Sequence, residues 1–100
     1  MRRLPAIAAA GLALAACAPD AWRHSPTFDA FLRQISRECH PSTIGNMLVG
    51  NAATDPFFLN QTSRLYHKII GPQEYVSSIN AFFPGNNRAA IDCILERLPQ

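Results

Sequence analysis

SPTFDAFLRQISREC, residues 25–39, has the clearest helical pattern of this 100-residue chain. Ser25 precedes Pro26, and a serine N-cap followed by a proline in the first turn is a typical helix start. Apolar residues then recur with helical spacing, so that one face of the helix is apolar: Phe28, Phe31, Leu32, Ile35 and Cys39. The stretch predicts an amphipathic helix that ends near His40, because Pro41 disfavours a helical conformation of the residue before it.

Three further helices are expected downstream. Asp55-Pro56 repeats the cap-and-proline start and predicts a helix that extends to Ile70, although the poor helix formers of 60–63 favour a break near Thr62. Gly71-Pro72 is expected to end this helix and to begin the next, and a last helix follows Asn86 or Asn87. The apolar stripes of the three helices are Phe58, Leu65, Tyr66, Ile69 and Ile70; Tyr75, Val76, Ile79, Phe82 and Phe83; and Ala90, Ile91, Ile94, Leu95 and Leu98.

The segment 41–54 has mixed signals. Ser42 or Thr43 is a suitable cap for a short helix through Ile44, Met47 and Leu48, with Gly50-Asn51 as its stop. No run of alternating apolar and polar residues bounded by hairpin turns is recognised in the sequence. The expected fold class is therefore all-α, a small bundle of four to five short helices.

The first residues of the chain indicate export. Arg2 and Arg3 precede an apolar run, 4–14, which is shorter than the ~20 residues of a membrane-spanning helix. Leu14-Ala15-Ala16-Cys17, which follows, resembles the lipobox of bacterial lipoproteins. The resemblance implies that Cys17 is acylated after removal of a signal peptide, and that acyl chains hold the protein at a membrane. Ordinary cleavage after Ala18 is the alternative.

This resemblance sets the domain organisation and the location. Residues 1–16 are expected to be the lipoprotein signal peptide, 17–25 the lipidated cysteine and a short tether, and 26–100 the helical domain. Residue 18 is alanine and not aspartate, which by analogy with enteric sorting favours the outer membrane, with the domain facing the periplasm.

Two cysteines remain once Cys17 is assigned to lipid. In an exported protein the pair Cys39 and Cys93 most simply predicts a disulfide, which completes the expected bundle. A catalytic or metal-bound thiol is the alternative. The mature segment keeps 9 − 2 = 7 basic residues against 7 acidic ones. A net charge of zero without a basic run argues against a nucleic-acid partner.

The sequence contains only weak candidates for catalytic, metal-binding or partner-binding residues. His24, His40 and His67 lack the spacing of a metal site, and no cofactor is expected. Phe57-Phe58 and Phe82-Phe83 either fill the core or line a pocket, and an aromatic side chain left outside would mark a partner surface. Asn46 and Asn51, in the polar segment 42–54, are the other candidates for partner binding.

Three functions remain open. The leading one is a lipid-anchored, non-catalytic interaction module that binds an envelope protein or peptidoglycan. The second is a carrier of a small apolar ligand or lipid between helices. The third is a small envelope enzyme that uses His40 or His67.

Overall fold

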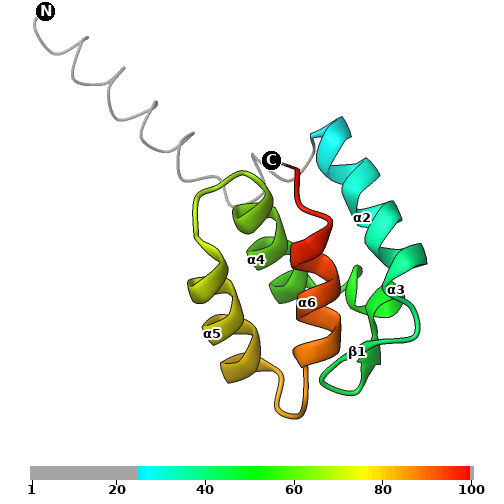
Figure 1. Ribbon diagram of the computed structural model, residues 1–100, viewed down its shortest axis with the longest axis vertical. Helices are drawn as coiled ribbons and strands as arrows, with labels where there is room; N and C mark the ends of the chain where they lie inside the picture. Colours follow the sequence, from blue (N-terminus) through cyan, green and yellow to red (C-terminus); the bar gives the residue numbers. More distant parts are fainter. Residues whose placement is uncertain (1–24, 100) are drawn as a thin grey trace, which may run out of the picture.

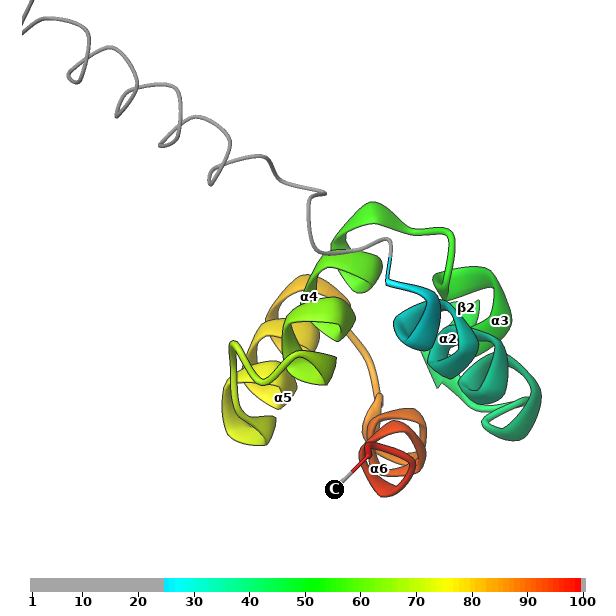
Figure 2. The same cartoon turned by 90° about the horizontal axis from the view of Figure 1, so that it is seen from above.

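The computed structural model describes residues 25–99, which form five helices and one two-stranded sheet (Figure 1). The elements in chain order are α2 (Pro26–Glu38), β1 (Thr43–Ile44), β2 (Met47–Leu48), α3 (Val49–Ala52), α4 (Pro56–Tyr66), α5 (Pro72–Phe82) and α6 (Arg88–Glu96). Figure 2 shows α4 and α5 side by side on one side of the molecule, α2 and α3 on the other, and α6 beside the space between the two pairs. The expected helical bundle is confirmed, but the fold is not purely all-α.

Cys17 and the signal segment 1–16 lie outside the described residues, as does the tether up to residue 24. Within residues 25–99, no helix is both long enough and apolar enough to cross a bilayer.

The predicted starts of two helices are confirmed by their caps. The Ser25 hydroxyl accepts a hydrogen bond from the Phe28 backbone N–H at 3.0 Å. The Asp55 carboxylate accepts two, from the Phe57 and Phe58 N–H groups at 2.9 and 3.0 Å. In both helices the proline occupies the first turn, where a missing N–H group leaves no hydrogen bond unmade.

The segment after Pro41 folds as a hairpin, so the short helix expected through Ile44, Met47 and Leu48 is wrong. Thr43 pairs with Leu48 and Ile44 with Met47, and Gly45-Asn46 makes the turn. Gly45 has φ +60°, as in a type II′ turn, in which the first of the two turn residues has a positive φ and is usually glycine. The single helical turn α3 comes after the hairpin instead of spanning it.

The start of α4 holds as predicted, but its interior and its end differ. No break occurs at Thr62, because its buried hydroxyl lies 2.8 Å from the Tyr75 hydroxyl on α5 and this contact outweighs a weak helix propensity. The helix ends at Tyr66 and not near Ile70, since Lys68 takes the left-handed conformation with φ 62°. The N–H of Ile69 then bonds to the Arg64 carbonyl at 2.8 Å, which is a Schellman end.

Gly71 consequently has another role than the one expected. It is the N-cap of α5, with φ −90°, and Pro72 begins that helix as predicted.

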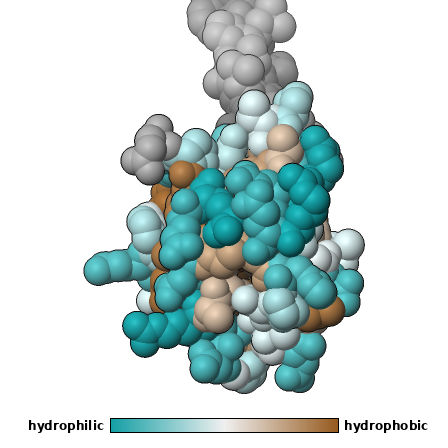
Figure 3. All heavy atoms as spheres, turned by 45° about the vertical axis from the view of Figure 1, so that its right-hand side comes forward, coloured by the Kyte–Doolittle hydropathy of each residue, from teal (hydrophilic) through white to brown (hydrophobic). Residues whose placement is uncertain are grey.

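The core is a single cluster to which every helix and the hairpin contribute. Its fully buried members include Phe28 and Ile35 from α2, Ile44 from β1, Phe58 from α4 and Ile79 from α5. At about 25 cal/mol per Å² of buried apolar surface, such side chains supply the main stabilisation of so short a chain. By contrast, the side of the molecule on which α2 lies presents mainly hydrophilic residues to solvent (Figure 3).

The predicted disulfide between Cys39 and Cys93 is confirmed. It joins the end of α2 to the middle of α6, with the two Cα atoms 5.7 Å apart. An ion pair reinforces the same junction, because the Arg97 Nε donates to the Glu38 carboxylate at 2.7 Å and its Nη1 donates to the Cys93 carbonyl at 3.0 Å. The Gln34 Nε2 also donates to the Glu38 carboxylate, at 3.3 Å. The hydrogen bonds that Glu38 accepts, first from Arg97 and then from Gln34, lower its pKa.

Candidate functional site

The end of the domain farthest from the start of α2 is the candidate site. Phe28, near the start of α2, contacts His67 at the end of α4, with ring centroids 5.9 Å apart. Phe57, at the start of α4, stacks on Phe82 at the end of α5. Because α4 has 11 residues, about 16 Å of helix separates these two regions. We call the region around the end of α5, the 83–87 connection and the Gly45-Asn46 turn the distal end, which lies at the bottom of Figure 1.

A buried asparagine holds the distal end together. Asn87 is 2% exposed, and its Oδ1 accepts a hydrogen bond from the Gly45 N–H at 2.6 Å. Its Nδ2 donates to the Asn80 Oδ1 at 3.0 Å and to the Phe83 carbonyl at 2.8 Å. One side chain therefore joins the hairpin, α5 and the connection to α6. The sequence suggested Asn87 only as a helix cap, and its side chain does not cap α6.

Gly45 fits this contact for two reasons. Its positive φ favours glycine, and a Cβ at this position would lie 3.3 Å from the Phe83 Cβ. A side chain would therefore press the turn away from the connection that Asn87 ties to it.

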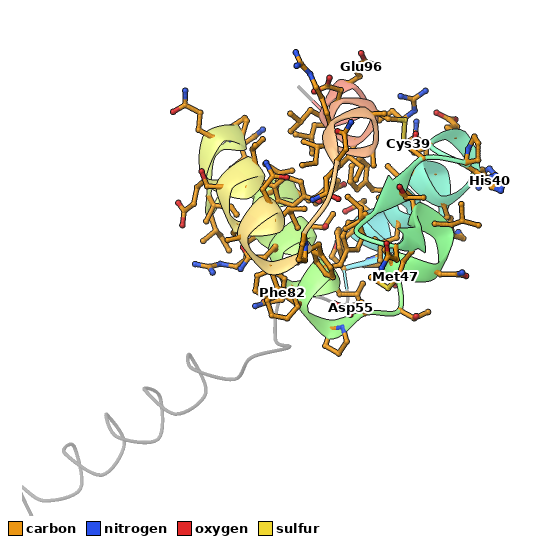
Figure 4. All side chains as sticks on the ribbon, turned by 90° about the horizontal axis from the view of Figure 1, so that it is seen from below. Cys39, His40, Met47, Asp55, Phe82 and Glu96 are labelled. Atoms are coloured by element: carbon orange, nitrogen blue, oxygen red, sulfur yellow. A yellow bond between two sulfur atoms is a disulfide. The ribbon has the colours of Figure 1, made fainter. Side chains whose placement is uncertain are left out.

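Two stacked phenylalanines, one exposed and one half-buried, lie at the distal end. Phe57 and Phe82, which we call the aromatic pair, stack with centroids 3.9 Å apart and an angle of 11° between their planes. Phe82 is 55% exposed, whereas Phe58 and Phe83 are buried in the core. Phe57 is half-buried and packs against the core, so Phe82 is the exposed member of the aromatic pair. Figure 4 shows Phe82 at the edge of the molecule, on the side of Asp55.

A hollow opens between α5 and α6 at the same end. This α5–α6 hollow has a volume of about 320 Å³, and its lining includes Val76, Asn80, Asn86, Arg88, Ile91 and Asp92. Ile91 is buried and Val76 is half-buried, whereas the four polar residues are exposed. The hollow therefore combines an apolar floor with a polar rim. Val76 also lines a second, more apolar groove nearer the start of α5, where Pro72 and Leu95 are among the other lining residues.

The two predicted partner-binding residues lie on different parts of the fold. Asn46 is exposed in the hairpin turn, beside the connection that Gly45 contacts. Asn51 is exposed on α3, which packs against α2. Asn46 thus belongs to the distal end and Asn51 does not.

The His67 ring is hydrogen-bonded to residue 63, one helical turn earlier in the chain. The His67 Nδ1 lies 2.8 Å from the Ser63 carbonyl oxygen and 3.3 Å from the Ser63 Oγ. Because a carbonyl only accepts, Nδ1 carries a hydrogen and donates it, and it is then not a base for the hydroxyl. His40 is exposed after α2, at a different edge of the molecule from Phe82 (Figure 4).

The strongest pKa shift belongs to a structural tyrosine. Burial raises the pKa of Tyr75, which is fully buried and hydrogen-bonded to Thr62. Over residues 25–99, no three His, Cys, Asp or Glu side chains are placed to hold a metal ion.

No protein-family model, characterised protein or solved structure significantly matches the chain. The motif at Cys17 and the geometry of the distal end are therefore the observations that bear on its function.

Proposed function

We propose that the protein is a lipid-anchored envelope protein that acts as a small, non-catalytic interaction module. Cys17 holds it to a membrane, with outer-membrane placement and a periplasmic domain as the favoured location. Its partner is an envelope protein or peptidoglycan, and the distal end makes the contact.

The single observation that carries this proposal is the position of the aromatic pair. The tether joins the domain at Ser25, and Phe82 is exposed at the opposite end of α4 and α5. Seven tether residues, 18–24, reach at most about 25 Å. An anchor at Cys17 would keep the start of α2 near the bilayer and leave the aromatic pair free to meet a partner.

The chemistry of the patch suits protein recognition. Exposed aromatic side chains on a rigid surface are favoured at the centres of interfaces, because they bury much area and lose little conformational entropy. Phe82 is held by stacking on Phe57 and by an edge contact with Phe83, with centroids 5.0 Å apart. The disulfide, the Asn87 hydrogen bonds and the packed core keep this surface in one arrangement.

The anchor is tested by metabolic palmitate labelling with and without globomycin. We expect a labelled mature protein, no label after Cys17→Ala, and an unprocessed precursor in the presence of the inhibitor. A normally processed product without label would remove the anchor from the proposal.

The partner surface is tested by an affinity pull-down from the cell's own membranes. Phe82→Ser and Ile69→Ser form a matched pair, because the two side chains are 55% and 54% exposed. We expect Phe82→Ser to lose the partner that the wild-type protein retains, and Ile69→Ser to keep it. Equal retention by both variants would contradict a role for the aromatic pair.

A further inference from the structure

The rim of the α5–α6 hollow presents hydrogen-bond donors in a fixed direction. The Gly45 N–H can only donate, so the Asn87 Oδ1 faces it and the Asn87 Nδ2 faces Asn80. Asn80 must then accept through its own Oδ1, at 3.0 Å, which leaves its NH₂ group for a ligand. The orientation of this rim amide is therefore set by the backbone of the hairpin, through Asn87.

A second rim amide has the same arrangement. The Asn86 Oδ1 accepts from the Arg88 backbone N–H at 3.1 Å, which again leaves the NH₂ group. The Arg88 guanidinium is 87% exposed, and its Nε lies 3.8 Å from the Asp92 carboxylate. An exposed pair at this distance is weak in water, so the guanidinium is available to a ligand.

The floor of the hollow differs from its rim. Val76 and Ile91 offer only apolar surface, and the volume of about 320 Å³ is at the low end of the range for ligand pockets. A ligand that fits the hollow would carry hydrogen-bond acceptors at one end and a small apolar group beside them. It would be no larger than a few amino-acid residues. A free carboxylate suits the donors, because it only accepts and binds guanidinium strongly.

We propose that the α5–α6 hollow binds the carboxylate end of a short peptide whose last side chain is small and apolar. The carboxylate accepts from Asn80, Asn86 and Arg88, and the side chain rests on Val76 and Ile91. The inference rests on the proposed function, since it names a ligand for the interaction module. Two sources share this chemistry, namely cell-wall peptides that end in D-alanine and protein C-termini that end in an L-residue.

The test is NMR titration of the full-length protein, purified in detergent from the producing cells. The probes are N-acetyl-D-Ala-D-Ala, N-acetyl-L-Ala-L-Ala and the carboxamide of each. We expect at least one acid to shift the amide signals of Asn80, Asn86 and Arg88, with a Kd on the order of 1 mM for so small a ligand. Its carboxamide should bind about tenfold more weakly, because a charge-assisted hydrogen bond is lost.

Isosteric variants separate binding from folding. Asn80→Asp and Asn86→Asp keep the oxygen that accepts within the protein but replace the NH₂ donor by a second acceptor. Each variant should bind the acid about tenfold or more weakly than the wild type does. Asn51→Asp, the same change at an exposed position on α3, should leave the affinity unchanged. Asp92→Asn should strengthen binding, since it removes the negative charge beside Arg88.

The D- and L-peptides distinguish the two possible sources of the ligand. Preference for the D-peptide identifies the cell wall as the source and preference for the L-peptide identifies a protein terminus, and both support the site. The proposal is overturned if neither acid shifts the rim signals at tens of millimolar, or if the Asn80→Asp and Asn51→Asp variants bind equally. Since this titration needs neither the anchor nor Phe82, its failure would leave the pull-down result standing.

Discussion

The side chain of Asn87 accepts a 2.6 Å hydrogen bond from the backbone of Gly45, 42 residues earlier in the chain. This contact fastens the hairpin turn to the connection between α5 and α6. Within residues 25–99, the distal end contains neither a long strand nor a disulfide, so this hydrogen bond helps to fix its shape.

Asn87→Ala should destabilise the domain by about 2–3 kcal/mol, because it removes three hydrogen bonds and leaves a partly buried Gly45 N–H without its acceptor. Urea denaturation followed by circular dichroism measures the loss. Asn51→Ala, at an exposed position on α3, should cost less than about 0.5 kcal/mol. Equal losses in the two variants would show that the Asn87 hydrogen bonds carry no particular weight.

Gly45→Ala should cost about 1–2 kcal/mol, because alanine is strained at φ +60° and its Cβ would lie 3.3 Å from the Phe83 Cβ. The matched change is Gly50→Ala in α3, where the nearest atom to a new Cβ is the Ser36 carbonyl oxygen at 3.9 Å. That variant should be neutral or slightly stabilising. Thermal melts of the two proteins give the comparison, and a stable Gly45→Ala variant would refute the requirement for glycine in the turn.

Replacing both cysteines of the disulfide by serine should lower the free energy of unfolding by about 4 kcal/mol, the chain-entropy value for residues 54 apart in sequence. Guanidinium denaturation of the oxidised protein and of the Cys39→Ser/Cys93→Ser variant checks this value. A variant that unfolds at the same denaturant concentration as the wild type would mean that the packed core alone holds α2 to α6.

The pKa of Glu38 gives a prediction with a definite sign. It is lowered in the folded state by hydrogen bonds from Arg97 and Gln34. A lowered carboxyl pKa contributes stability above the unfolded pKa, and this contribution is lost as the pH falls through the folded pKa. Arg97→Gln should therefore raise the pKa of Glu38 in an NMR titration and flatten the loss of stability in acid. Arg64→Gln, a charge change on α4, should leave that pKa where it is; a Glu38 titration unmoved by Arg97→Gln would rule out the ion pair as its cause.

Local signals predicted much of the helical fold. The caps at Ser25 and Asp55, the prolines after them and the apolar stripe of α2 depend on neighbours in sequence, and they hold in the structure. The disulfide followed from export and an even count of cysteines. The hairpin was missed although Gly45-Asn46 is a turn dipeptide, because strands of two residues have no alternation to detect.

The candidate site could be predicted only in part. Helix geometry indicates that the two members of a doubled aromatic need not both be buried, but which member is exposed depends on the packing of α4 against α5. The role of Asn87 and the orientation of the rim amides depend on Gly45, which is 42 residues away in the sequence. No local sequence pattern contains that contact. The end of α4 was missed because Lys68, and not a glycine, adopts the left-handed conformation.

Photo-crosslinking in intact cells shows whether the distal end meets a partner while Cys17 anchors the protein to the membrane. An azidophenylalanine at position 82 replaces a phenylalanine with little change of shape, and the same probe at the equally exposed position 69 is the control. We expect one defined crosslinked product from position 82, none from position 69, and loss of the product when Cys17→Ala releases the protein. The same products from both positions, or a product from position 82 that persists without the anchor, would contradict it.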